Sequence, residues 1–155
     1  MKQLWIIVSV ALSLSSCGNE APKVEMKPLP AAAKPLDESQ RLPKPNLVES
    51  HVVDKELLGK PFMPGGTLAH YKKGAHEYDI FLGQLATPND AAFLLIEWKK
   101  VLTQAHYLAS YGGYFGMDAG RPIFVFTKGR WIAGVGGLAE KDADAEARVL
   151  AAGLN

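Results

Sequence analysis

The sequence predicts an α+β fold, in which a single antiparallel β-sheet carries helices on one face and a proline-rich linker precedes the domain. Segments 67–85 and 123–135 each divide into two strand-like runs around a short polar turn that contains glycine, which is typical of hairpins. Segments 88–104 and 142–152 have helical patterning. Because strands joined by tight turns pair antiparallel, we expect one antiparallel sheet covered by these helices.

The composition of the 155 residues changes abruptly near residue 51. Segment 19–50 holds six of the ten prolines and has neither glycine nor an aromatic residue, so it cannot build a hydrophobic core. Fourteen of the fifteen glycines, every tyrosine and every phenylalanine follow it. We therefore predict a linker at 17–51 and a small globular domain at 52–155.

The first half of this domain predicts a hairpin and then a helix. Residues 67–71 and 76–85 predict the two strands. Residues 87–90 (TPND) predict a helix start, because threonine caps, proline suits the first helical position and aspartate favours the positive end of the dipole. We expect this helix to reach about Gln104, with an apolar stripe formed by Ala91, Leu94, Leu95, Trp98, Val101 and Leu102.

The remaining segments predict further strands and a closing helix. Residues 107–115, rich in aromatic residues and glycine, predict one strand with bulges. Residues 123–126 and 131–135 predict a second hairpin, which we place at the centre of the sheet. Residues 142–152 predict the closing helix, because they are rich in alanine and meet a glycine at their end. Residues 52–58 suit a short helix or a strand, and we expect the helix.

The first seventeen residues have the pattern of a secretory signal. A short positive start precedes an apolar run at 4–14, which is shorter than the roughly 20 residues of a membrane span. Leu14-Ser15-Ser16-Cys17 then resembles the lipobox of bacterial lipoproteins. This resemblance implies that residues 1–16 are removed as a signal peptide and that Cys17 receives acyl chains such as palmitate.

The same resemblance implies a location. Each buried methylene contributes about 0.8 kcal/mol, so two or three acyl chains hold a protein at a membrane essentially permanently. Gly18 stands where an aspartate would resemble the inner-membrane retention signal. We therefore expect a protein that is lipid-anchored to the bacterial cell envelope, at the outer membrane facing the periplasm. The membrane, reached through the lipid on Cys17, is an expected partner.

A second resemblance rests on residues 65–71 (GGTLAHY), 74–78 (GAHEY) and 128–131 (KGRW). These stretches resemble an uncharacterised domain family of secreted bacterial proteins. The family implies no known activity, and its motif residues are mainly glycines and aromatic residues, so it assigns no functional residue to this chain.

The charge balance and the cysteine content exclude several classes of protein. Lys and Arg number 17 against 16 Asp and Glu, so no positive field attracts a nucleic acid, and we expect none as a partner. Cys17 is the only cysteine, which excludes disulfide frameworks, thiolate zinc sites, iron–sulfur clusters and covalent haem attachment. We expect no cofactor.

Two local patterns suggest sites that we do not favour. Residues 134–139 (GVGGLA) match a dinucleotide-binding pattern, but only residues 140–155 follow, too few for the second parallel strand that such a site needs. His70 and His76, on opposite arms of the first hairpin, and Asp79 allow a metal or a base–carboxylate pair, but the connecting loop is basic. No spacing supports a serine triad at Ser110.

The second hairpin combines positive charge with an aromatic ring. Arg121, Lys128 and Arg130 surround it beside Trp131, and these four residues are the candidate contacts with an envelope protein or a glycan. The aromatic residues of 107–115 are an alternative surface for stacking on a sugar.

The absence of a coherent catalytic set does not favour an enzyme. We expect a lipid-anchored lipoprotein with a non-enzymatic binding or assembly domain. One alternative is a periplasmic carrier or binder of a small hydrophobic ligand, and a second is a hydrolase.

Overall fold

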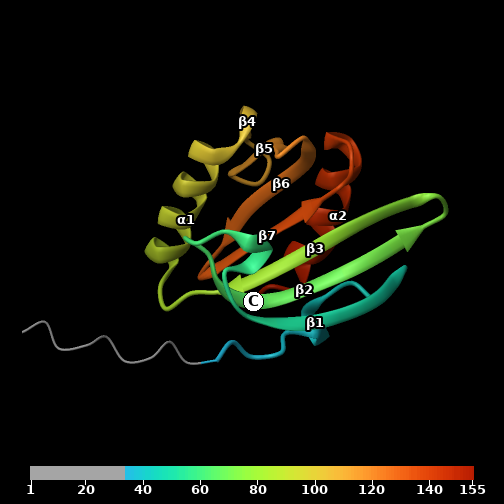
Figure 1. Ribbon diagram of the computed structural model, residues 1–155, viewed down its shortest axis with the longest axis horizontal. Helices are drawn as coiled ribbons and strands as arrows, with labels where there is room; N and C mark the ends of the chain where they lie inside the picture. The colour runs from blue at the N-terminus through green and yellow to red at the C-terminus, as the bar shows by residue number, and fades with distance from the viewer. Residues whose placement is uncertain (1–33) are drawn as a thin grey trace, which may run out of the picture. The chain divides into compact units, whose positions relative to one another are not determined.

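The computed structural model describes residues 34–155. They form one seven-stranded antiparallel sheet with the strand order β1-β2-β3-β7-β6-β5-β4 and two α-helices, so the predicted α+β class is confirmed (Figure 1). The expected signal peptide, Cys17 and the first part of the linker lie outside the described residues. In chain order the elements are η1 (Ser39–Arg41), β1 (Leu47–Lys55), η2 (Leu57–Gly59), β2 (Pro64–Lys73), β3 (His76–Gln84), α1 (Pro88–Val101), β4 (Thr103–Leu108), β5 (Gly113–Asp118), β6 (Arg121–Lys128), β7 (Trp131–Gly136) and α2 (Glu140–Ala152).

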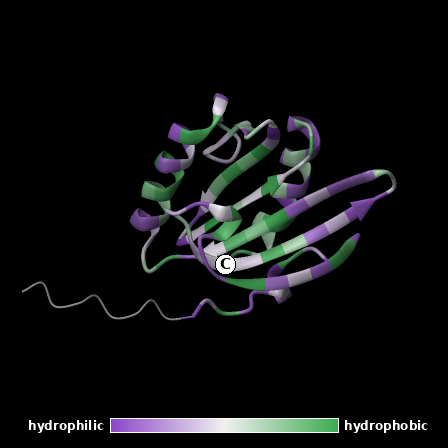
Figure 2. Ribbon diagram, viewed as in Figure 1, coloured by the Kyte–Doolittle hydropathy of each residue, from purple (hydrophilic) through white to green (hydrophobic). Residues whose placement is uncertain are grey.

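Strands β2 and β3 form the predicted first hairpin. Their register pairs Thr67 with Leu82 and Lys73 with His76, and Gly74 in the turn has a φ of +62°, which favours glycine. Hydrophilic residues gather toward the tip of this hairpin, whereas the central strands are hydrophobic (Figure 2). The part of the hairpin near its turn therefore extends beyond the core.

Helix α1 begins at the predicted cap. The Thr87 hydroxyl accepts a hydrogen bond from the Asp90 N–H at 3.2 Å, and the Asp90 carboxylate accepts one from the Thr87 N–H at 3.0 Å. The helix ends at Val101 rather than near Gln104, because β4 begins two residues later. Neither helix of the described residues has the length and apolar character of a membrane span. The predicted stripe is buried at Ala91, Leu95, Trp98 and Leu102, partly buried at Leu94 and exposed at Val101.

The two helices pack on opposite faces of the sheet, and the expectation that they share one face is wrong. Trp98 of α1 belongs to a core with Ile123 and Val125, whereas Ala147 of α2 belongs to a core with Phe124. Successive residues of a strand point to opposite faces, so the two cores lie on opposite sides of β6. Because β6 is apolar at successive positions, each face needs a cover, and one helix supplies each (Figure 1).

The second hairpin, β6 and β7, lies in the middle of the sheet, as predicted. Every residue of β7 is buried. Gly134 is required there, because a Cβ would collide with the Phe124 carbonyl oxygen and the Phe81 ring. The glycines of this strand thus allow close packing across the sheet.

Two segments differ from their predictions. Residues 107–115, expected as one strand, form the end of β4, a turn and the start of β5, and Gly112 in that turn has a φ of +66°. Residues 52–58, expected as a helix, continue β1 to Lys55 and then enter η2. In β1 the backbone pairs with β2, which outweighs a weak local preference for a helix.

The folded part begins before the expected boundary at residue 52. Leu42 is 2% exposed within the core that α2 covers, and the Tyr71 hydroxyl donates to the Pro43 carbonyl at 2.8 Å. The Glu38 N–H donates to the Thr67 hydroxyl at 3.0 Å. These contacts use the Leu42 side chain, the Pro43 carbonyl and the Glu38 N–H, none of which depends on a proline N–H, so a proline-rich segment can still pack against the domain.

Candidate functional site

Asp79 is the centre of a charged cluster on the α1 face of the sheet. Its Oδ1 lies 2.9 Å from Nδ1 of His70, its register partner on β2, and its Oδ2 accepts from Nη1 of Arg121 at 2.6 Å. The base–carboxylate pair that the sequence allows is therefore formed. No serine, threonine or cysteine of residues 34–155 is hydrogen-bonded to the His70 ring, so within this part of the chain the pair orients Arg121 rather than a nucleophile.

Glycines at the end of β7 make room for Arg121. Its Nη2 donates to the Gly136 carbonyl at 3.2 Å, and a Cβ on Gly137 would lie 2.7 Å from the same nitrogen. Gly137 also has a φ of +100°, a conformation that favours glycine. The dinucleotide-like pattern at 134–139 thus packs against Phe81 and Arg121, within a sheet that is antiparallel throughout the described residues.

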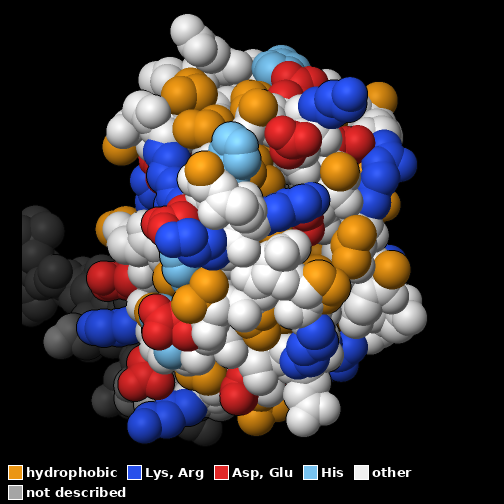
Figure 3. Space-filling model, turned by 90° about the vertical axis from the view of Figure 1, so that its right-hand side faces the viewer, with side chains coloured by type: hydrophobic (Ala, Val, Ile, Leu, Met, Phe, Trp, Pro, Cys, Tyr) orange, Lys and Arg blue, Asp and Glu red, His pale blue; other side chains and the backbone are white. Residues whose placement is uncertain are grey.

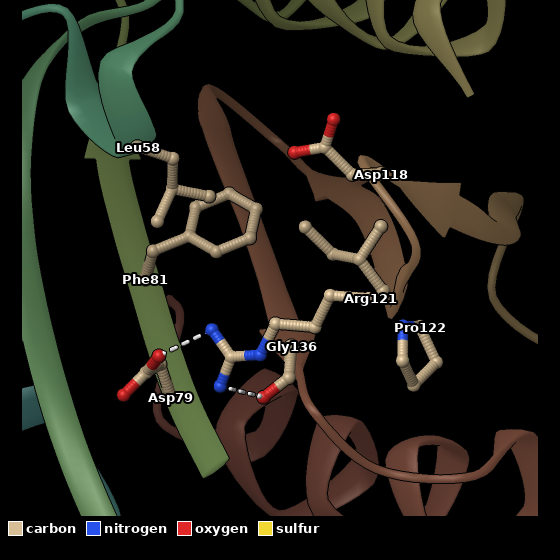
Figure 4. A pocket seen from close by; sticks show the side chains of 8 residues that line it. Leu58, Asp79, Phe81, Asp118, Arg121, Pro122 and Gly136 are labelled. Carbon is tan, nitrogen blue, oxygen red and sulfur yellow. Dashed lines mark hydrogen bonds and ion pairs between the residues drawn. The ribbon is translucent and has the colours of Figure 1, made fainter.

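A pocket of about 150 Å³ lies beside this cluster (Figure 4). The Arg121 side chain extends along it toward Asp79, Leu58 and Phe81 form one wall, and Asp118 lies on another side. The Lys60 ammonium donates to Asp118 Oδ1 at 2.6 Å. The pocket is therefore lined by the carboxylates of Asp79 and Asp118 and the guanidinium of Arg121, and the Lys60 ammonium lies beside it.

Near this pocket the backbone adopts conformations that are costly for L-residues. Leu58, which lines the pocket, has a φ of 59°, and Glu56 and Ala119, which are close in sequence to lining residues, have φ values of 54° and 47°. Each such residue costs on the order of 1–3 kcal/mol and persists only when its surroundings impose it. Leu57, which is fully buried, holds η2 against the sheet. Strain of this kind is common at ligand sites, although Asn46 and Gln104, away from the pocket, also have a positive φ. The charged side chains therefore make this pocket a candidate site, and the strain of Leu58 agrees with that.

A second pocket, of about 370 Å³, lies at the turn of the second hairpin. The Arg41 guanidinium lies 4.9 Å from the centroid of the Trp131 ring, and the Lys128 ammonium donates to the Ala151 carbonyl at 2.5 Å. With the Gln84 amide oriented so that its oxygen points toward Arg130, that oxygen accepts hydrogen bonds from Nε of Arg130 at 3.1 Å and from Nη2 at 2.7 Å. We call these cations, Arg41, Lys128 and Arg130, the hairpin-end cluster.

The hairpin-end cluster lies at the negative end of the α2 dipole. Arg41 donates to the carbonyl of Gly153, directly after the helix, at 3.2 Å, and Lys128 donates to the Ala151 carbonyl in the last turn, so both cations lie where the helix dipole favours positive charge. Glu38 is the acidic partner of Arg41, at 2.8 Å. Elsewhere, as on the face drawn in Figure 3, acidic and basic side chains are interspersed. The hairpin end thus carries a local excess of positive charge.

The four predicted partner contacts do not form one surface. Arg121 and Lys128 stand at opposite ends of β6, about 23 Å apart at about 3.3 Å per residue. Trp131 is only 3% exposed, and its ring packs in the core beneath Arg41. Arg41 was not among the predicted contact residues, because it precedes the expected domain and the residues that it contacts are far away in sequence.

The other polar candidates are separated by the fold. His76 lies on the α2 face, opposite His70, because it shares a face with Tyr78. Within residues 34–155 no three His, Cys, Asp or Glu side chains are placed to hold a metal ion. The Ser110 hydroxyl donates to Asp144 at 3.3 Å on the surface.

The predicted aromatic surface at 107–115 is also divided. Tyr111 and Phe115 pack against the core on the α2 face, and Tyr114 packs on the α1 face. Tyr107 remains exposed, edge-on to Tyr114 at 5.4 Å between ring centroids. These rings therefore serve mainly to cover the two cores.

Two stacked tyrosines lie in the core beneath α2. The rings of Tyr71 and Tyr78 are 5.1 Å apart. The Tyr78 hydroxyl is buried and makes no hydrogen bond of ordinary geometry among the described residues. Burial raises the pKa of Tyr78 to about 12, and the nearby Glu146 carboxylate adds to this increase through its negative charge and a weak interaction with the protonated hydroxyl.

Comparisons of the chain with protein-family models, with curated proteins and with solved structures found no match.

Proposed function

We propose that this protein is a lipoprotein of the bacterial cell envelope, held at the outer membrane by acyl chains on Cys17 and facing the periplasm. Its folded domain acts as a non-enzymatic binding module. The lipobox resemblance at residues 14–17 supports the anchor, and the preceding positive and apolar segments support export.

The hairpin-end cluster is the proposed contact surface, and its partner is an acidic segment of another envelope protein. The observation that carries this proposal is the convergence of Arg41, Lys128 and Arg130 on one open pocket, with Glu38 as the neighbouring carboxylate. Arginine and lysine side chains bind carboxylates through charge-assisted hydrogen bonds. Because hydrogen bonds to α2 and Gln84 already position these cations, little side-chain entropy is lost on binding.

A test of the contact surface is carbodiimide coupling on isolated membranes, which joins a lysine amine to a neighbouring carboxylate. We expect a cross-link from Lys128 to an Asp or Glu of another protein, identified by mass spectrometry. Arg130→Glu should reduce its yield several-fold through charge repulsion, whereas Arg148→Glu, a reversal on α2 away from the pocket, should not. An unchanged yield in Arg130→Glu contradicts the proposal, and coupling to a uronic acid identifies a glycan instead.

The anchor is tested separately. Cys17→Ser should abolish incorporation of radiolabelled palmitate and release the protein from the membrane fraction. Palmitate labelling that persists in Cys17→Ser, or a wild-type protein that does not sediment with membranes, contradicts the anchor.

A further inference from the structure

We propose that the pocket beside Arg121 binds a small zwitterion of the α-amino acid class, with the ligand carboxylate on Arg121 and the ligand ammonium on Asp118. This site lies at the opposite end of β6 from the hairpin-end cluster, so it is independent of the proposed partner contact.

Arg121 is positioned to receive a carboxylate. A guanidinium has five N–H donors, and two of them are occupied by Asp79 and the Gly136 carbonyl. The remaining donors are available on a side chain that is half exposed. Because Asp79 and the Gly136 carbonyl already fix the guanidinium, binding does not require it to be ordered.

Asp118 is positioned to receive an ammonium group. One of its oxygens accepts from Lys60, and no ion pair joins Asp118 to Arg121 although the two residues are register partners at the β5–β6 turn. Both side chains line the pocket without being paired to each other (Figure 4). A ligand bound between these side chains can therefore contact the Asp118 carboxylate and the Arg121 guanidinium at the same time.

The size and walls of the pocket limit the ligand. A cavity of about 150 Å³ accommodates a molecule of roughly benzene size, which suits a small amino acid and is too small to enclose a long acyl chain. Phe81, Leu58 and Pro122 supply apolar surface for a short aliphatic side chain.

The charge balance disfavours ligands of a single sign. A simple anion would meet Asp79 and Asp118, and a simple cation would meet Arg121 and Lys60. A ligand that carries both charges satisfies both sides, so each charged group should contribute to affinity.

The test is a nuclear magnetic resonance titration of the full chain in detergent micelles with alanine, propionate and ethylammonium. Propionate is alanine without the ammonium group, and ethylammonium is alanine without the carboxylate. We expect alanine to shift the backbone amide resonances of Leu58, Arg121 and Gly136 saturably, and each truncated probe to bind at least about tenfold more weakly. The absence of a saturable shift with alanine overturns the proposal, as does equal binding of propionate or ethylammonium.

Substitutions of the charged pocket residues test whether alanine binds in this pocket. Asp118→Asn should weaken alanine binding at least about tenfold while leaving propionate binding no weaker, and Arg121→Gln should abolish binding of both. Arg148→Glu, on α2 and away from both pockets, should leave the alanine titration unchanged. Because this titration needs no partner protein, its failure is distinguishable from a failure of the hairpin-end contact. Since Arg121→Gln also removes a partner of Asp79, its fold is checked by the dispersion of its amide resonances. Undiminished alanine binding by a folded Asp118→Asn variant overturns the proposal.

Discussion

The cores on the two faces of the sheet are built differently, because the largest buried rings come from strands on the α2 face and from the helix on the α1 face. On the α2 face the strands supply large rings, such as Phe124 and Tyr78, and the helix supplies three alanines and Leu150. On the α1 face the helix supplies the largest ring, Trp98, and the strands supply Phe81 and smaller side chains such as Ile123 and Val125.

This difference explains where the proposed amino acid pocket lies. Helix α1 packs mainly over β5, β6 and β7, and the short η2 packs against β2. The pocket opens between η2 and the β5–β6 turn, where no long helix covers the face. A core built around one large side chain leaves its margin open, whereas small side chains let a helix approach closely.

The largest expected effect tests the dependence of the α1 face on one side chain. Trp98 is fully buried, packs against Phe62 and Phe81, and its Nε1 donates to the Met63 sulfur at 3.2 Å. Trp98→Ala should lower the free energy of unfolding by about 3–5 kcal/mol, as measured by denaturant titration. Phe93→Ala, on the exposed side of the same helix, should change it by less than about 0.5 kcal/mol. Similar losses in both variants would contradict this account of the α1 face.

An intermediate effect tests the close approach of α2. Ala147 is fully buried, so Ala147→Leu should force the helix away from the sheet and cost about 1–3 kcal/mol in the free energy of unfolding. Val149→Leu, at an exposed position of α2, is the matched control and should be nearly neutral. If Ala147→Leu is also neutral, the α2 face is not closely packed.

The smallest effect separates the two stacked tyrosines. At pH 7, Tyr71→Phe loses the hydrogen bond to the Pro43 carbonyl and should cost about 0.5–1.5 kcal/mol in the free energy of unfolding, whereas Tyr78→Phe removes a hydroxyl that interacts only weakly with Glu146 and should cost less. Denaturant titration at neutral pH measures both changes. Equal costs would contradict the assignment of a well-formed hydrogen bond to Tyr71 alone.

The pH dependence of stability sharpens this contrast. The pKa of Tyr78 is raised from about 10 to about 12 in the folded state, so its contribution to stability is complete below pH 10 and is lost as pH rises toward 12. Over that interval the unfolded state releases the proton first and is favoured. Tyr78→Phe should therefore lose less stability than the wild type between pH 10 and 12, and an identical loss would contradict the shift.

Local signals predicted both hairpins and the start of α1, because turns and caps depend on neighbouring residues. The placement of the helices was not predicted, although a signal exists: residues 123–126 (IFVF) lack polar alternation, which indicates a strand buried on both faces. Residues 107–115 were assigned to one strand because their aromatic content outweighed the turn signal of Gly112 and Gly113.

The candidate sites were only partly predictable, because their contacts join distant segments. The His70–Asp79 pair follows from the hairpin register, whereas Arg121 comes from a strand 42 positions beyond Asp79. Arg41 meets the end of α2 across 112 positions, from a segment whose composition suggested a linker. Cross-sheet register and chain-end contacts are set by tertiary packing, which local patterns do not encode.

The contact of Arg41 with Gly153 has a practical consequence for modified versions of the protein. Any tag or fusion partner attached after Asn155 would emerge beside Lys128 and crowd the surface to which we assign partner binding. The β2–β3 turn at Gly74, where an added Cβ would meet nothing within 4 Å, is the better place for an insertion. A reporter placed there leaves the hairpin-end cluster uncovered.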